Sequence, residues 1–193
     1  MYRRCVSEKS AAQQRQFETA LLELMKKRLF EEISVSELCR HAELSRKTFY
    51  RLYDAKADVI YAMIDHALLD AGTFEPDETV GPGGLHRFLA YWKSRKELLD
   101  MLKRNRISAL LSQQAVIHIM HEAPEIARCF GADDSPYGRE LIVFYTTGLF
   151  SLVLDWADRD FDRSIDEMSA MIMDLLINPP VKRPLPMDPQ DCI

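Results

Sequence analysis

Apolar residues recur every three or four positions along most of the chain, and no alternating apolar and polar run is long enough to indicate a strand. One stripe runs through Phe17, Leu21 and Met25, and a wider apolar face returns between Val59 and Leu68. This periodicity predicts an all-α fold. The expected helices cover residues 10–29, 35–42, 46–52, 55–71, 84–104, 107–122, 137–157 and 164–178, with a break allowed near Ser94.

Glycine and proline gather between Gly72 and Gly84 and interrupt the helical pattern, so we place a domain boundary there. The expected units are residues 1–71, residues 72–178 and an irregular, proline-rich tail at 179–193. Charge divides in a similar way, because residues 1–66 carry 12 Lys/Arg against 10 Asp/Glu whereas residues 67–193 carry 13 against 20. The N-terminal unit is therefore the one suited to meet phosphate, since attraction to phosphate acts locally.

The longest uncharged apolar stretch, Leu141–Leu154, is shorter than the roughly 20 residues that a membrane span needs. We expect a buried helix there and no membrane partner. Residues 2–20 lack the apolar stretch of a signal peptide, and the four scattered cysteines are typical of free thiols in a reducing compartment. The expected location is the cytoplasm.

Two short helices separated by a tight turn are expected between residues 34 and 52. Ser34, followed by Glu37, has the spacing of a capping box that begins the first helix, and Ser45 can cap the second. This spacing is typical of a helix-turn-helix, in which the first helix braces the second and the second enters the major groove of DNA. Ser34 and Ser45 are counted among the expected DNA contacts.

The second of these helices carries the side chains that DNA recognition requires. Arg46 and Lys47 stand in its first turn, where Arg can pair with both acceptors of a guanine edge and Lys can meet guanine or phosphate. Thr48 and Tyr50 offer hydroxyls to phosphate. Lys56, at the start of the following helix, adds a cation where backbone N–H groups also favour phosphate. The predicted partner is double-stranded operator DNA.

This segment resembles the TetR-type (TetR/AcrR) transcription regulators over about residues 10–70. The resemblance rests on Ala42-Glu43-Leu44-Ser45, then Thr48-Phe49-Tyr50, Tyr53 and Lys56. The C-terminal half is similar to a class that includes a coactivator of dihydroxyacetone-kinase genes, through Phe144-Tyr145-Thr146-Thr147-Gly148, Trp156 and Ser164–Met168.

The resemblance implies an N-terminal three-helix helix-turn-helix domain followed by a C-terminal helical domain that dimerises and binds an unidentified small-molecule effector. The function it implies is a ligand-responsive transcription regulator, with repression favoured, that binds its operator as a homodimer. The expected dimer residues are Leu141, Tyr145, Gly148, Leu152, Met168, Ile172 and Leu175. The expected effector-binding residues are Trp92, Met101, Met120, Phe144, Tyr145 and Trp156.

Two residues depart from the family pattern. Glu43 replaces the usual glycine of the turn, so the turn must either avoid positive φ or carry strain, and an acid lies close to the DNA face. Leu52 stands where many members have a polar phosphate contact. These departures favour an alternative function, a TetR-like coactivator or co-regulator that has lost DNA affinity and acts through a protein partner.

Other chemistry finds little support in the sequence. His118, His121 and Glu122 fall on one helical face, but three ligands without a fourth make a weak metal pattern. We find no set of nucleophile, base and orienting residue, and no glycine-rich phosphate loop. An enzyme, a metal site and a cofactor are therefore not expected.

Overall fold

The computed structural model describes residues 7–71, 82–129, 132–133 and 135–177, and this part of the chain contains helices and turns but no strand. The expected all-α fold is confirmed. The helices are α1 (Glu8–Met25), the short 3₁₀ turn η1 (Phe30–Glu32), α2 (Val35–His41), α3 (Arg46–Leu52), α4 (Ala57–Ala71), α6 (Pro82–Ser94), α7 (Lys96–Arg104), α8 (Ala109–Glu122), α9 (Pro124–Cys129), α10 (Gly138–Asp158) and α11 (Ile165–Ile177).

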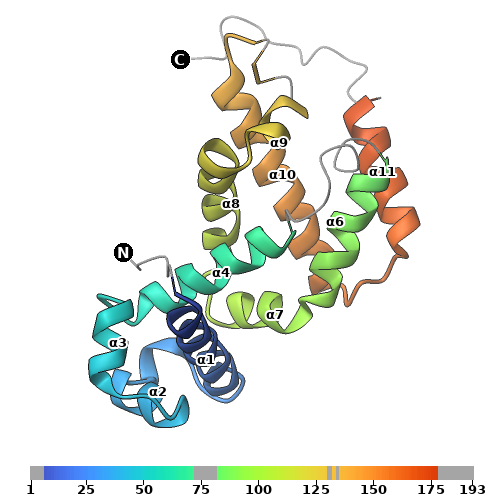
Figure 1. Ribbon diagram of the computed structural model, residues 1–193. Helices are drawn as coiled ribbons and strands as arrows, with labels where there is room; N and C mark the ends of the chain where they lie inside the picture. Colours follow the sequence, from blue (N-terminus) through green and yellow to red (C-terminus); the bar gives the residue numbers. More distant parts are fainter. Residues whose placement is uncertain (1–6, 72–81, 130–131, 134, 178–193) are drawn as a thin grey trace, which may run out of the picture.

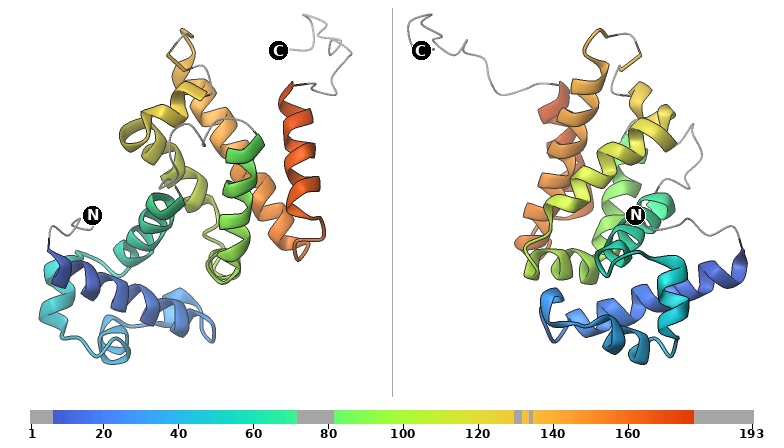
Figure 2. Two further views of the ribbon diagram at one scale, coloured as in Figure 1. Left: turned by 45° about the vertical axis from the view of Figure 1, so that its right-hand side comes forward. Right: turned by 90° about the vertical axis from the view of Figure 1, so that its left-hand side faces the viewer.

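Helices α1 to α3 and η1 form a small group at one end of the molecule, which we call the head (Figure 1). Helix α4 leads from the head into the C-terminal half, packing against α1 at one side and against α8 at the other. There α10 lies along α8 and also contacts α6 and α7, while α11 packs against α6 (Figure 2). Helix α3 stands at the outer edge of the head, away from the C-terminal half (Figure 1).

One hydrophobic core runs through both parts of the molecule. It joins Phe17 and Phe49 in the head to Trp92 and Trp156 in the C-terminal half, and the buried side chains of α4 connect the two ends. A second, smaller cluster is formed by Ile119, Ala127 and Ile142. The orientation of the head is therefore set by packing and not by a linker alone.

Most helix boundaries agree with the sequence periodicity. The helix expected at 84–104 is divided at Arg95 into α6 and α7. Pro124 ends α8 as expected, but it also begins the unexpected α9, since proline fits the first turn of a helix. The boundary expected at the glycine-rich loop falls largely on residues 72–81, which lie outside the described residues, as does the tail at 179–193.

Two Ser-x-x-Glu sequences, Ser34 with Glu37 at α2 and Ser164 with Glu167 at α11, differ in how completely they form a capping box. At α11 the box is complete, because Ser164 N donates to Glu167 Oε2 (2.7 Å) and Glu167 N donates to Ser164 Oγ (3.2 Å). These hydrogen bonds lower the pKa of Glu167. At α2 only half of the box forms: Glu37 N donates to Ser34 Oγ (3.1 Å), but the Glu37 carboxylate binds Arg28 (2.6 Å). A charged guanidinium is a stronger donor than a backbone amide, so the Glu37 carboxylate binds Arg28 and not Ser34 N. The prediction of a complete capping box at α2 is therefore wrong.

Candidate nucleic-acid interface

Helices α2 and α3 are held at a fixed angle by the turn between them. Thr48 N donates to Ser45 Oγ (3.0 Å), so Ser45 caps α3. Glu43 N donates to Arg40 O and Leu44 N donates to Cys39 O, a pair of bonds that forms a Schellman ending to α2. Both helix ends are therefore satisfied locally, and the expected Ser45 cap is confirmed.

One side of α3 is anchored in the core of the head. Phe49 and Leu52 are buried, and the Phe49 ring makes edge contacts with Phe17 at a centroid distance of 5.4 Å. Tyr53, directly after α3, packs against Phe17 at 5.9 Å. Because these aromatic contacts fix the inner side of α3, its rotation is fixed and the opposite side faces solvent.

The solvent-facing side of α3 presents Arg46, Lys47 and Tyr50. The Arg46 guanidinium lies 5.9 Å from the centre of the Tyr50 ring and donates to Ser36 Oγ (3.4 Å). Among the described residues, no hydrogen bond or ion pair is recorded for Lys47. Thr48 is half-buried, and its hydroxyl is engaged with that of Ser45 (3.0 Å). Three of the expected DNA contacts in α3 thus share one exposed face.

Arg51 was not expected to have a role, but its side chain links α3 to α1. Its guanidinium donates to Ser10 Oγ (3.0 Å) and Gln13 Oε1 (2.5 Å), both on α1. The bond links residues 41 positions apart, so helical spacing gave no signal of it. Both partners are neutral, so Arg51 keeps its positive charge at the edge of the α3 face.

Leu52 and Cys39 belong to the core of the head. The Leu52 side chain is 2 % exposed, so it cannot be replaced by a polar phosphate contact without burying that group. Cys39 is also buried, and burial raises the pKa of its thiol, an effect that the charge of Arg46 opposes. The family departure at residue 52 is therefore a packing feature.

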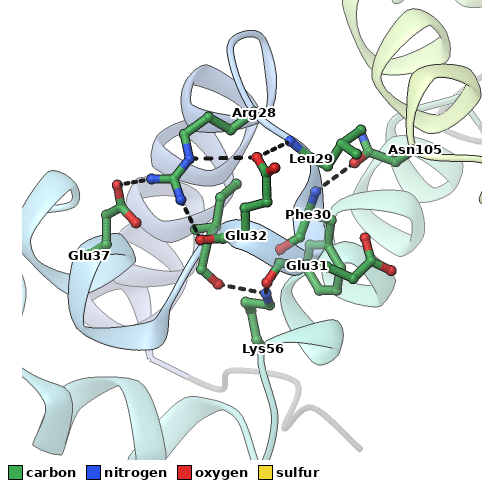
Figure 3. A network of polar contacts seen from close by, with 9 residues as sticks. Arg28, Leu29, Phe30, Glu31, Glu32, Glu37, Lys56 and Asn105 are labelled. Atoms are coloured by element: carbon green, nitrogen blue, oxygen red, sulfur yellow. Dashed lines mark hydrogen bonds and ion pairs between the residues drawn. The ribbon is translucent and has the colours of Figure 1, made fainter.

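Lys56 does not take the place expected for it. Its ammonium turns inward and donates to Phe30 O and Ile33 O, each at 2.5 Å, and lies 4.1 Å from the centre of the Phe30 ring (Figure 3). Burial lowers the pKa of Lys56, and the charge of Glu31 opposes this effect. Lys56 therefore binds backbone carbonyl oxygens of η1 and of the residue after it, stabilises the head, and does not share the exposed face of α3.

Glu43 adopts the strained alternative that the sequence allowed. Its φ is 53°, in the left-handed region that favours glycine, because it occupies the position of the Schellman ending where the chain reverses. Its side chain is exposed. The residue therefore places both backbone strain and a negative charge beside the cations of α3.

Replacing Glu43 by glycine should improve both stability and association with DNA. We expect Glu43→Gly to raise the free energy of unfolding by about 0.5–1.5 kcal/mol, because the left-handed backbone costs a side chain about 1 kcal/mol. Removing the charge should also strengthen DNA binding by roughly three- to tenfold at low salt. Urea denaturation and fluorescence anisotropy measure the two effects. Glu43→Gln separates them, since it removes only the charge; if neither variant binds DNA more tightly, Glu43 is not at the DNA face.

The expected effector-binding residues are not brought together around one space. Trp92, Met101 and Trp156 are buried in the main core, and Met120 packs against the smaller cluster. Phe144 is 72 % exposed. Trp156 Nε1 donates to Arg163 O (3.2 Å), whereas Trp92 Nε1 is buried with no hydrogen-bond partner in the described part of the chain. Tyr145 is half-buried.

An open groove of about 490 Å³ lies on the head instead, between α1 and the end of α2. None of the six expected effector-binding residues lines it. Its lining residues are Ala12, Arg15, Gln16, Thr19, Ala20, Glu23, His41, Ala42 and Glu43. In α8, His118 is buried while His121 and Glu122 are exposed, and the described part of the chain contains no group of three or more potential metal ligands close enough to hold an ion.

The expected dimer residues divide between the surface and the interior. Met168 and Ile172 are fully buried and belong to the main core of the chain itself, where α11 packs against α6. Gly148 is exposed, with open space where a Cβ would stand, and Leu175 is 40 % exposed. The remaining members, Leu141, Tyr145 and Leu152, are half-buried. The solvent-exposed side of α10 therefore carries Phe144 and Gly148, whereas the expected dimer residues Leu141, Tyr145 and Leu152 lie at its edges.

Comparison with known proteins places the fold but not the family. No family model and no curated protein matches the chain. Among solved structures, the crystal structure of Lin0861 from Listeria innocua is similar, with a TM-score of 0.71 and 19% sequence identity over 89% of this chain and 93% of that one. At this identity the likeness shows a shared helical fold along nearly the whole length.

Helix α10 is the one described helix that is long and apolar enough to cross a membrane by length and composition. Within its most apolar window 33% of the residues are buried, and the helix packs against α8, α6 and α7. One helix of this kind is weak evidence for a membrane span, because core helices meet the same criteria of length and composition.

Proposed function

We propose that the chain is a cytoplasmic transcription regulator that binds operator DNA as a homodimer through α3 and responds to a small-molecule effector, with repression as the favoured mode. The observation that carries the proposal is the fixed orientation of α3. Its inner side is anchored by Phe49 and Leu52, and Arg46, Lys47 and Tyr50 stand together on its outer side. A braced helix with cations in its first turn is what the major groove accepts.

The charge around α3 supports the same proposal. Arg40, Arg46, Lys47 and Arg51 are all exposed, and Glu43 is the opposing acid of the turn. Neither Arg46 nor Arg51 is neutralised by its recorded partners, which are uncharged side chains. These cations keep their charge for phosphate and base contacts, although the chain as a whole has a net charge of −5.

The outer face of α10 supports dimerisation. Phe144 and the exposed residues one and two turns further on, Thr147, Gly148 and Ser151, form a stripe of one large ring and three small residues. A ring that is 72 % exposed gains from burial, and small residues allow a second helix to approach closely. A symmetric copy of the same face is self-complementary in this arrangement.

The interior of the C-terminal half supports an effector that carries hydrogen-bonding groups. Trp92 Nε1 and Thr146 Oγ1 are buried and have no hydrogen-bond partner among the described residues. A buried polar atom left without a partner costs about 1–3 kcal/mol, so an effector that satisfied either atom would recover that free energy.

A salt titration of DNA binding tests the proposal. We expect the wild-type chain to bind duplex DNA with a logarithmic affinity that falls steeply as salt concentration rises, because several phosphates exchange their counterions for Arg and Lys. We expect Lys47→Ala to reduce the magnitude of that slope by about 2 per dimer, because each subunit loses one cation, and to weaken binding to all sequences similarly. Fluorescence anisotropy between about 50 and 200 mM salt measures both quantities.

The matched control is Lys103→Ala, since Lys103 lies in the C-terminal half and pairs with Asp158 (2.5 Å). Its salt slope should equal that of the wild type. If Lys47→Ala leaves the slope unchanged, the exposed face of α3 is not the DNA contact.

The second candidate is a co-regulator that keeps this fold but acts through a protein partner. Three observations favour it: the acid at Glu43, the burial of Leu52 and the inward turn of Lys56. Each of them removes or opposes one phosphate contact. A wild-type chain that shows no salt-dependent binding to any duplex would favour this candidate.

A further inference from the structure

The turn η1 lies between two parts of the chain that are distant in sequence. Phe30 N donates to Asn105 Oδ1 (2.7 Å), and Phe30 O accepts from Lys56 Nζ (2.5 Å) (Figure 3). Asn105 belongs to the turn between α7 and α8, and Lys56 to the short segment between α3 and α4. The backbone N–H and C=O of Phe30 thus connect the C-terminal half to the segment that follows α3.

The Asn105 end of this connection is held rigidly. Asn105 Nδ2 donates to Met101 O (2.8 Å), which fixes the rotation of the side-chain amide. Arg106 N donates to Lys103 O and Ile107 N donates to Leu102 O, closing a Schellman ending in which Arg106 has a φ of 58°. The acceptor offered to Phe30 is therefore part of a fixed helix end.

The Lys56 end is equally fixed. The Lys56 ammonium also donates to Ile33 O, two residues before the start of α2. Lys56 itself lies four residues after the end of α3. Two further contacts link the end of α1 to α7: Lys26 pairs with Glu97 (3.0 Å), and Arg104 donates to Lys26 O. These two contacts are solvent-exposed, and exposed pairs contribute little. The partly buried bond to Asn105 is the better-shielded link at this corner.

We propose that Asn105 is a positioning residue for DNA recognition, which acts through Phe30 and Lys56 and, together with the packing of the shared core, fixes the angle of the head on the C-terminal half. The inference rests on the proposed function. In a symmetric dimer, that angle decides the separation of the two α3 helices, and the separation decides which half-site spacing the dimer accepts. Losing the bond leaves the head held by the packing of α1 on α4, where Glu18 pairs with His66 (2.6 Å), and by the exposed contacts of Lys26 with Glu97 and Arg104.

The matched variants are Asn105→Ala and Asn105→Asp. Alanine removes both the acceptor for Phe30 N and the donor to Met101 O. Aspartate keeps the acceptor for Phe30 N and loses only the donor within α7. A difference between the two variants is therefore due to the link to the head and not to the local helix end.

The experiment uses a symmetric duplex that the wild-type chain selects from a random-sequence pool. The spacer between its half-sites is then lengthened and shortened by one and two base pairs. We expect the wild type and Asn105→Asp to lose tenfold or more in affinity on these changes, and Asn105→Ala to lose less than about threefold. Binding to a single half-site should be equal for all three proteins, because the head itself is unaltered.

Amide hydrogen exchange at Phe30 gives a readout that does not need DNA, and it should be faster in Asn105→Ala than in Asn105→Asp. The inference is overturned if Asn105→Ala keeps the wild-type spacing profile or if Asn105→Asp loses it. A wild-type chain that selects no duplex at all overturns the proposed function and this inference together.

Discussion

Lys56→Met should lower the free energy of unfolding by about 2–3 kcal/mol, although Lys56 lies at the surface end of the head. Methionine keeps the length of the apolar stem but leaves Ile33 O without its donor, while Phe30 O keeps only the bond from Ile33 N (3.2 Å). A partly buried carbonyl that loses its donor costs about 1–3 kcal/mol, and the contact with the Phe30 ring is lost as well. Urea denaturation followed by circular dichroism measures the change.

The same variant shows whether Lys56 stabilises the fold of the head or contacts a DNA phosphate. Loss of a phosphate contact in each subunit would reduce the magnitude of the salt slope of DNA binding by about 2 per dimer, as expected for Lys47→Ala. Loss of a residue that only stabilises the fold should leave the slope unchanged at temperatures where the head remains folded. Full stability in Lys56→Met together with a reduced slope would return Lys56 to the DNA face.

Phe144→Asp should convert the proposed dimer to monomers without unfolding the chain. The ring is 72 % exposed in the single chain, so an aspartate there stays hydrated and the fold loses almost nothing. At a dimer contact the same carboxylate meets its symmetry mate, loses water and loses the burial of the ring. Central aromatic residues of interfaces contribute about 2–4 kcal/mol, so the dissociation constant should rise roughly 30- to 1000-fold.

Analytical ultracentrifugation measures the shift, and Ile117→Asp is the control. Ile117 is also exposed, at 50 %, but it lies on α8 outside the proposed face. If Phe144→Asp sediments as the wild type does, or if Ile117→Asp alone gives monomers, the contact lies elsewhere on the molecule.

The fold could be read from the sequence because its signals are local. Helical spacing needs neighbours three and four residues apart, and caps such as Ser45 and Ser164 act within one turn, so the helices expected at 46–52 and 164–178 fall within one residue of α3 and α11. The outward orientation of Arg46, Lys47 and Tyr50 follows from the same periodicity, because Phe49 and Leu52 occupy the inner positions.

The contacts that sequence reasoning missed are long-range. Arg51 reaches Ser10 across 41 positions, and Asn105 reaches Phe30 across 75, and neither pair has a spacing that a helix or turn would reveal. Lys56 was assigned from its charge and position, but three carbonyl oxygens that come together only in the folded head decide its direction. Similarly, Met168 and Ile172 form an apolar stripe that suits either a dimer or α6, and only packing chooses between them.

The unbroken core has a practical consequence for any use of the head, the proposed DNA-binding unit, as a separate module. Helix α4 buries Val59, Ile60, Met63, Ile64 and Leu68, between α1 and α8. Truncating the chain after Ala71 would expose the part of that surface that packs against α8. Solvent-exposed apolar surface of this kind promotes aggregation. Swapping specificities between such proteins therefore calls for grafting the surface residues of α3 onto an intact recipient, not for transplanting the N-terminal fragment.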